Sequence, residues 1–369
     1  MPYYLRHYFD PDFKHEKLTP QFTSDGSMTY FYLGYVQNVV QGQVVAEVID
    51  LDQHPEITDY DPRFISAEPC FPCGPNCAPH PGKPSRMIAT ANGYCFYNDG
   101  LITVKKLLNV RRDIDFHTGN VMFVGDVIAH ESVQSGFTLH GNNILVKGTV
   151  ENALVRAAGN IVCESGIKGG GNGRLKSNGN VKAPFCENII IEADGNIELD
   201  GSCMHSTLHA EGSIMVKGRL QGGEACARRV IFTQGQLGGH STPTKVILGF
   251  SPRNIRHKRA LEKHLEALLP ALERFERLIE KKPDLAEEFS LQIRLLQRKI
   301  KVRNAQLRQL QAEMAAEAAT AAGCRLICPG KIESGTEIVI GDVTHQVTDF
   351  AHGREFRLEN GEIVAKKLT

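Results

Sequence analysis

A short phrase recurs between residues 119 and 239, and this repeat constrains the fold more strongly than any other feature of the chain. Each copy starts at a β-branched residue, and successive starts are separated by 23, 17, 20, 16, 17 and 17 residues. The starting residues are Val121, Ile144, Ile161, Val181, Ile197, Ile214 and Ile231. A repeat of this length cannot enclose a hydrophobic core alone, so each copy has to stack on its neighbours.

Positions within the repeat indicate how the copies stack. Apolar residues stand two and six positions after the start of most copies, and glycine stands four positions after it, as Val146, Gly148 and Val150 do after Ile144. Alternating apolar residues predict a short strand with one buried face, and a glycine at a fixed place predicts a corner. The pattern predicts a mainly β protein with an α insertion, in which residues 119–250 form a right-handed parallel β-helix (solenoid).

The repeat is irregular in three places. In the copy that starts at Val181, Phe185 and Glu187 stand where glycine and an apolar residue are expected. Bulges or loops are expected to interrupt the register at residues 133–141 and 168–176.

Heptad spacing follows the solenoid. Apolar residues recur at alternating steps of four and three in two arms between residues 252 and 322. They are Leu261, Leu265, Leu268, Leu272, Phe275 and Ile279 in the first arm, and Phe289, Ile293, Leu296, Ile300, Leu307, Leu310 and Met314 in the second. This spacing predicts an antiparallel coiled-coil hairpin over residues 251–323, with Lys282, Pro283 and Asp284 between the arms. A strand pattern then returns, so a small closing β unit is expected over residues 324–369.

The second arm is basic, with no acidic residue between Glu288 and Glu313. Its basic residues are Arg294, Arg298, Lys299, Lys301, Arg303 and Arg308. One interpretation is a surface for an acidic partner, nucleic acid or anionic lipid. The interpretation we favour is pairing with glutamates of the first arm, because antiparallel arms need flanking ion pairs.

Three segments precede the solenoid. Residues 1–68 are expected to form a small β unit, and residues 85–118 supply strands that lead into the solenoid or cap it. Between them, residues 69–84 are rich in proline and cysteine, which predicts a loop without regular structure.

The sharpest chemical signal lies in this loop. Cys70, Cys73, Cys77 and His80 have the spacing Cys-x2-Cys-x3-Cys-x2-His. Three thiols and an imidazole fit the four ligands of a tetrahedral structural Zn²⁺, and Cys95 is an alternative fourth ligand. An iron–sulfur cluster fits less well, because it usually takes four cysteines. The other interpretation is a flexible loop of reduced cysteines, or one adventitious disulfide.

Several phrases, and the order of the parts, resemble the flagellar assembly protein A family of bacteria over about residues 85–369. The phrases are Asp-Gly-Leu-Ile-Thr-Val from Asp99, Asp-Phe-His-Thr-Gly-Asn-Val from Asp115, Gly-Asp-Val from Gly125, Val-Gln-Ser-Gly-Phe from Val133, Gly-Ile-Lys-Gly from Gly166, Leu-His-Ala-Glu-Gly from Leu208 and Ser-Thr-Pro-Thr from Ser241. The resemblance implies a β-helix, a coiled-coil hairpin and a closing β unit. It links the chain to flagellar assembly, polar localisation and scaffolding, and implies no catalytic or cofactor-binding residues.

Composition limits the classes of function. Lys+Arg and Asp+Glu are 42 each, so the net charge is zero and nucleic acid is not an expected partner. Ten cysteines in 369 residues are too few and too scattered for a disulfide framework. Residues 1–12 lack the apolar core of a signal peptide, and no stretch is long and apolar enough to predict a membrane span. These features predict a cytoplasmic protein.

Three functions are compatible with these patterns. The preferred one is a non-enzymatic scaffold that binds protein partners through the coiled coil or a face of the β-helix. The alternative is a polymer-forming, bactofilin-like protein whose solenoids stack end to end, and a homo-oligomer is compatible with either. An enzyme acting on polysaccharide ranks last, because it needs paired carboxylates. The repeats carry scattered acids instead, namely Asp126, Glu164, Asp194 and Asp200.

Overall fold

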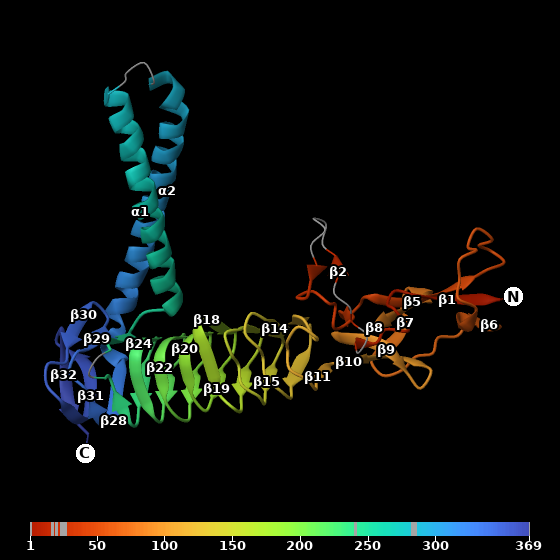
Figure 1. Ribbon diagram of the computed structural model, residues 1–369, viewed down its shortest axis with the longest axis horizontal. Coiled ribbons are helices and arrows are strands. Elements are labelled where there is room, and N and C mark those ends of the chain that lie inside the picture. The colour runs from red at the N-terminus through yellow and green to blue at the C-terminus, as the bar shows by residue number, and fades with distance from the viewer. Residues whose placement is uncertain are drawn as a thin grey trace. The chain divides into compact units, whose positions relative to one another are not determined.

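The computed structural model describes residues 2–15, 18, 21–22, 28–239, 242–281 and 286–368. The chain is mainly β: it forms a parallel β-solenoid of about eight turns, two helices that follow it, and small closing strands (Figure 1). The predicted fold class is therefore confirmed. The chain divides into two compact units, one of residues 1–194 with 198–200 and one of residues 195–197 with 201–369.

The first unit begins with antiparallel sheets. The orders are β6–β1–β5–β8–β7 in a five-stranded sheet, β10–β9–β4 in a three-stranded sheet and β2–β3 in a two-stranded one. The strands are β1 (Tyr3–His7), β2 (Gln21–Phe22), β3 (Met28–Thr29), β4 (Asn38–Val39), β5 (Val44–Asp50), β6 (Ile65–Ser66), β7 (Cys77–His80), β8 (Lys83–Ala89), β9 (Gly93–Asn98) and β10 (Leu101–Lys105). The two larger sheets share an apolar core that includes Val45, Met87 and Ile102.

The solenoid of the first unit follows, with its inward side chains stacked in three columns. Its strands are β11 (Leu107–Val110), β12 (Val121–Met122), β13 (Asp126–Ala129), β14 (Thr138–Gly141), β15 (Ile144–Val146), β16 (Leu154–Ala157), β17 (Ile161–Cys163), β18 (Ile167–Ser177), β19 (Val181–Ala183) and β20 (Cys186–Ala193). One column is Leu108, Val127, Ile144, Ile161 and Val181; the second is Val121, Leu139, Val155, Leu175 and Ile191; the third is Ile114, Val133, Val150, Ile167 and Cys186. All are buried, and full burial of such an aliphatic side chain contributes about 1.5–3 kcal/mol.

The register of the first copy differs from the prediction. Ile144 pairs with Val127, whereas Val121 pairs with Leu139 in another column. The copy predicted to start at Val121 was therefore assigned to the wrong face. The spacing of 23 residues between Val121 and Ile144 is measured from one face of the solenoid to another. Apolar alternation is present on every face of the solenoid, so alternation alone cannot tell one face from the next.

The same error produced one false interruption. Residues 133–141 belong to a regular coil, since Val133 forms bridges to a coil on each side and β14 is paired over its length. The irregularity expected at residues 168–176 is confirmed, because the register of β18 against β20 shifts between Lys168 and Gly173.

The recurring glycines allow coils to approach closely. A Cβ atom on Gly148 would lie 2.4 Å from the carbonyl carbon of Glu131, and one on Gly218 would lie 2.6 Å from that of Gly201. Real Cβ atoms do not come this close to backbone, so any side chain here would push two coils apart. Close packing, and not a left-handed backbone, is thus the reason for glycine at these two corners.

The copy at Val181 reaches the same stacking by another route. The ring of Phe185 occupies the place of the missing glycine and lies against Gly166, where an added Cβ would be 2.4 Å from it. Cys186, and not Glu187, then pairs with Ile167 and points inward. This corner is one residue shorter than the others, which is why the sequence pattern fails there.

Asparagine side chains connect neighbouring coils. The Oδ1 atom of Asn143 accepts the backbone N–H of Asn160 at 3.0 Å, and the Oδ1 of Asn160 accepts that of Asn180 at 2.8 Å. In the second unit, Asn196 accepts the N–H of Ser213 at 2.8 Å. Because each bond joins one coil to the next, a slip of one residue would break it as well as move every apolar side chain outward.

The second unit continues the solenoid and includes the helices. Its solenoid strands are β22 (Cys203–Ala210), β23 (Ile214–Val216), β24 (Arg219–Ala227), β25 (Val230–Thr233), β26 (Gln236–Leu237), β27 (Thr244–Leu248), β28 (Arg325–Ile332) and β29 (Thr336–Ile340); β21 (Ile197–Leu199) has residues in both units. Although β28 follows the helices in sequence, it pairs in parallel with β25 and β26. The helical segment is therefore an insertion between two coils. The prediction had placed β28 and β29 in the closing unit of residues 324–369, whereas both strands pair in parallel with strands of the solenoid. The closing strands β30 (Val343–Gln346), β31 (Ala351–Glu359) and β32 (Glu362–Lys367) are antiparallel.

The two helices, α1 (Pro252–Lys281) and α2 (Ala286–Ala319), pack along each other and stand away from the coils of their own unit (Figure 1). Asn254 donates to the Glu317 carboxylate at 3.1 Å near one end, and the Phe275 and Phe289 rings are 5.3 Å apart near the other. Because the start of α1 contacts the end of α2 and the end of α1 contacts the start of α2, the two helices are antiparallel. The predicted turn at Lys282, Pro283 and Asp284 lies outside the described residues.

Candidate functional sites

The cysteine segment is more ordered than predicted. Cys77 begins strand β7, which pairs with β8, so the prediction of a loop throughout residues 69–84 is wrong at its end. Pro79 fits in this strand because β7 is at the edge of its sheet, where no further strand needs its N–H. Cys73 forms a bridge with Ile102, which brings this part of the loop against the three-stranded sheet.

The structure brings three of the predicted ligands into an apolar setting. Cys95 is buried, and Cys73 and Cys77 pack against the core that surrounds it. The Cys73 thiol donates to the sulfur of Met87 at 3.3 Å. Burial raises the pKa of Cys73, raises that of Cys77 to about 11 and raises that of Cys95 to about 12. All three are therefore neutral thiols at neutral pH.

The remaining predicted ligands lie apart from this arrangement. Cys70 is exposed, and the Nδ1 atom of His80 accepts the N–H of Gly82 at 3.0 Å. Within the described residues, no three or more His, Cys, Asp or Glu side chains are grouped so that they could hold a metal ion. The zinc site stays a prediction, which metal analysis of the purified protein tests.

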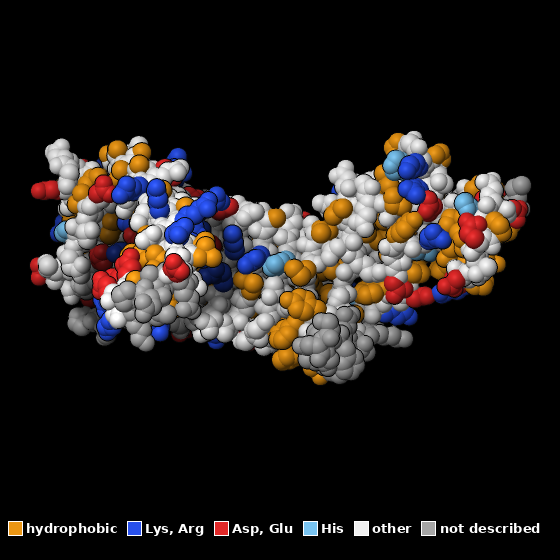
Figure 2. Space-filling view, turned by 90° about the horizontal axis from the view of Figure 1, so that it is seen from above, with side chains coloured by type: hydrophobic (Ala, Val, Ile, Leu, Met, Phe, Trp, Pro, Cys, Tyr) orange, Lys and Arg blue, Asp and Glu red, His pale blue; other side chains and the backbone are white. Residues whose placement is uncertain are grey.

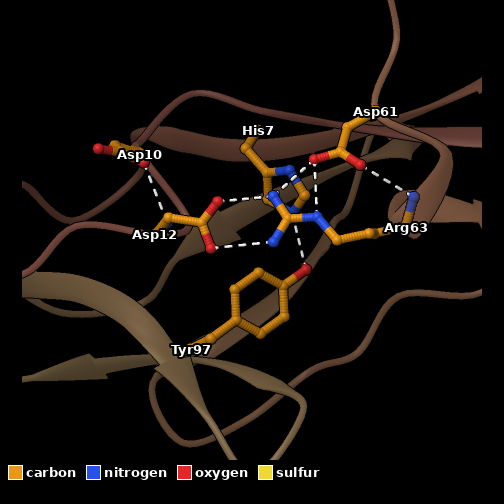
Figure 3. A network of polar contacts seen from close by, with 6 residues as sticks. All are labelled: His7, Asp10, Asp12, Asp61, Arg63 and Tyr97. Carbon is orange, nitrogen blue, oxygen red and sulfur yellow. Dashed lines mark hydrogen bonds and ion pairs between the residues drawn. The ribbon is translucent and has the colours of Figure 1, made fainter.

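A polar network lies nearby in the same unit (Figure 3). Arg63, in the short 3-10 helix Pro62–Phe64, is bonded to both Asp12 and Asp61, with closest distances of 2.6 Å to each carboxylate. The Nε2 atom of His7 is 2.7 Å from the Tyr97 hydroxyl. Hydrogen bonds from Arg63 lower the pKa of Asp12 and of Asp61, and burial lowers that of His7 to about 4.

This network joins segments that are distant in sequence. Both carboxylates already bind Arg63, so neither charge is unpaired. Burial raises the pKa of the Tyr97 hydroxyl beside His7 to about 12, so this hydroxyl stays protonated at neutral pH. A hollow of about 560 Å³ beside it is lined by Arg63, Cys70 and Tyr97, among others. We assign the network to holding the N-terminal segment on its sheet.

The helical hairpin has two distinct faces. Four of the predicted heptad residues, Leu261, Leu265, Ile300 and Leu310, are buried. On the outer face of α2, by contrast, Leu291, Leu295 and Val302 are 66 %, 49 % and 49 % exposed. Their spacing of four and seven residues places them on one side of the helix, which gives α2 a second apolar stripe.

Basic residues flank this second stripe. Arg294, Arg298, Lys299 and Lys301 are all exposed. The favoured interpretation of these charges is wrong for the residues that the structure describes, because none of the basic residues predicted for this arm has an ion pair with α1. The glutamates Glu262 and Glu273 pair instead within α1, with Lys258 and Arg277. Figure 2, which looks onto the hairpin from above, shows Lys and Arg side chains gathered beside it.

At the base of the hairpin, ionic contacts fix α1 to the solenoid of its unit. Arg259 donates two hydrogen bonds to Glu224 on β24, at 2.9 and 2.6 Å, and His209 on β22 is 3.1 Å from the same carboxylate. Burial alone would raise the pKa of Glu224, but the bonds from His209 and Arg259 and the charge of Arg259 outweigh it and lower that pKa to about 2. Glu224 is thus charged at neutral pH and binds both elements together.

Sequence analysis did not predict the polar network around Arg63 or the ionic contact between Glu224 and Arg259. Their members come from separate elements and share no motif or spacing. The second apolar stripe on α2 was present in the sequence as Leu291, Leu295 and Val302, but the stronger heptad pattern concealed it.

In the described residues, no helix is long and apolar enough to cross a membrane. No curated protein and no solved structure matches the chain. Residues 106–363 match the family described as Flagellar Assembly Protein A beta solenoid domain, which covers most of the chain and spans the solenoid, the hairpin and most of the closing strands. The chain therefore belongs to the Flagellar Assembly Protein A β-solenoid family.

Proposed function

We propose that this protein is a non-enzymatic scaffold, and that its hairpin binds an acidic amphipathic helix of a partner protein. Membership of the family suggests a role related to flagellar assembly. The observation that carries the proposal is the outer face of α2, where Leu291, Leu295 and Val302 are exposed between basic side chains.

The spacing of this face suits another helix. Apolar residues at heptad-like steps, with like charges on both flanks, are what a helix presents to a partner in a coiled coil. A partner helix with acidic residues at its flanking positions would form ion pairs with the basic flanks, which are Arg294, Arg298, Lys299 and Lys301. The same charges oppose pairing of this face with a second copy of itself, because basic residues would then meet basic residues.

The features of the solenoid favour a scaffold over a polymer. In the first unit, the N–H of Asn120 donates to the carbonyl of Phe31 at 2.7 Å, and Asn38 bonds the carbonyl of Met122 and the N–H of Val124. Backbone groups of an early coil are thus covered by the N-terminal segment. In the second unit, β31 and β32 cover the last coil, and β32 ends in Lys366 and Lys367, charges that discourage edge pairing.

Asp126 is one of the scattered acids of the repeats that an enzyme could use, and it has a structural role here. Its carboxylate accepts hydrogen bonds from the side chains of Asn142 and Asn143 and from the backbone of Asn143, at 2.8–3.0 Å. This use in holding adjacent coils supports a non-enzymatic role.

The decisive experiment is photocrosslinking in cells that produce the protein. A photocrosslinking amino acid replaces Leu295, and a matched sample carries it in place of Leu269, which is 46 % exposed on α1. We expect a defined protein adduct from position 295 and not from 269. We also expect it to disappear when Arg294, Arg298, Lys299 and Lys301 are all changed to Glu.

A binding assay with a defined probe accompanies it. A designed helix with leucine at its heptad positions and glutamate on both flanks should bind the full chain, and its lysine-flanked counterpart should not. Binding to vesicles of anionic lipid in place of the acidic helix would overturn the proposal, as would an adduct that survives charge reversal. Light scattering over a range of concentrations completes the test, since a mass that grows into filaments would favour the polymer.

A further inference from the structure

A pocket of about 460 Å³ lies in the first unit. The segment after β1 contributes Lys14 and His15, the segment before β4 contributes Tyr35, and strand β9 contributes Tyr94 and Phe96. Its volume falls within the range of about 300–1,000 Å³ that small-molecule sites occupy.

Aromatic rings form much of the wall. The Tyr94 and Phe96 rings are stacked with centroids 5.1 Å apart, and the His15 and Tyr35 rings are 5.4 Å apart. Tyr94 is held from behind by the Phe123 ring, at 6.0 Å, and by its place in the strand. A flat ring can stack on such a wall without rearranging it, because the strand fixes the rings before the ligand arrives.

The polar groups select for negative charge. The hydroxyls of Tyr35 and Tyr94 have no hydrogen-bond partner among the described residues, so each is available to donate a hydrogen bond to a ligand. Lys14 lines the pocket and is exposed. Within the described part of the chain, no Asp or Glu lines the pocket. Aromatic walls by themselves would suit a cation, but the positive charge of Lys14 opposes one.

We propose that this pocket binds a small aromatic carboxylate, with its ring against Tyr35 and Tyr94 and its carboxylate toward the two hydroxyls and Lys14. A single negative charge is matched by a single exposed lysine and two neutral donors. This inference goes beyond the scaffold role and does not depend on it.

The test uses indole-3-acetate as probe and the full chain as receptor. Because the protein contains no Trp, the fluorescence of the indole can be followed without a protein background. We expect a saturable change in the fluorescence of indole-3-acetate, with one binding site per chain. The uncharged analogue indole-3-acetamide should bind more weakly, since it keeps the ring and loses the charge.

Three variants locate the site. Tyr35→Ala should weaken indole-3-acetate binding about tenfold, through the loss of ring contact and one donor. Lys14→Gln should weaken the acid about two- to fivefold and leave the amide unchanged. Phe116→Ala, which alters a 59 % exposed ring outside the pocket, should leave both unchanged.

Thermal unfolding of each variant guards against a trivial result. Because Lys14 is exposed, we expect Lys14→Gln to leave the unfolding temperature unchanged, so that a change in affinity reports the lost charge. Absence of a saturable signal, equal affinity for the acid and the amide, or sensitivity to Phe116→Ala but not to Tyr35→Ala would each overturn the assignment.

Discussion

In the second unit, the solenoid coils and the helical hairpin use their apolar residues differently. Ile214, Ile231 and Leu326 stack in one column of the solenoid and have no exposed surface. In the hairpin, α2 buries Ile300 but leaves Leu291 two-thirds exposed. The coils bury their apolar residues within the chain, whereas the outer face of α2 keeps apolar side chains exposed.

Truncation of a column residue should have the largest effect. Leu220 is 1 % exposed and is paired with Cys203 and Leu237 in adjacent coils. Leu220→Ala should lower the free energy of unfolding by about 2–5 kcal/mol, because it removes buried contacts and leaves a cavity. Denaturant titration measures the change. A loss below about 1 kcal/mol would mean that the coils are far less tightly packed than the columns imply.

A corner glycine should come next. Gly218→Ala places a Cβ against the backbone of Gly201, a neighbour that cannot rotate away. We expect a loss of about 1–3 kcal/mol in the free energy of unfolding. Gly323→Ala is the matched control, since a Cβ there meets nothing within 4 Å. Equal effects at the two positions would show that contact between coils is not what requires glycine.

The junction between the two regions should respond to acid. The pKa of Glu224 is lowered from 4.5 to about 2 in the folded chain, so its contribution is complete above 4.5 and is lost as the pH falls toward 2. We expect Glu224→Gln to lower the free energy of unfolding by about 1–2 kcal/mol at neutral pH. We also expect the free energy of unfolding of this variant to depend less on pH between 4.5 and 2. Denaturant titrations of both proteins from neutral to acid pH measure this. Parallel curves for the two proteins would exclude Glu224 as the source.

The outer face of the hairpin should have the smallest effect on stability. Leu295→Ala is expected to change the free energy of unfolding by less than about 0.5 kcal/mol, because the side chain is already half exposed. It should nevertheless weaken binding of the acidic helix proposed above. A loss of stability comparable with that of Leu220→Ala would show that this face is covered within the chain and is not open to a partner.

Prediction from the sequence succeeded where the signal is local and repeated. The columns that contain Ile161 and Ile231, the insertion of two helices and the closing strands follow from spacing alone. It failed where two patterns are alike or where partners are distant. Val121 was placed on the wrong face because alternation is the same on each face, and the basic residues of α2 were paired with glutamates that bind within α1.

The candidate sites depended more heavily on the fold. The spacing of Cys70, Cys73 and Cys77 suggested that the three thiols bind one metal ion, yet the structure buries Cys77 partly with Cys95 and leaves Cys70 exposed. Burial raises thiol pKa values, and no property of the spacing reports burial. The aromatic pocket could not be predicted from the sequence either. Tyr35 and Tyr94 are distant in sequence and are brought together by the antiparallel pairing of β4 with β9.

The sequence alone determined that the chain stacks short strands into a solenoid and that a helical pair interrupts it. Periodic apolar residues and glycines carry this information, because each repeat meets its neighbour in the same way. Only the tertiary structure decided which face each strand occupies, which charges pair and which apolar residues stay exposed. Those outcomes depend on contacts between elements such as Arg259 with Glu224, and such contacts have no fixed separation along the chain.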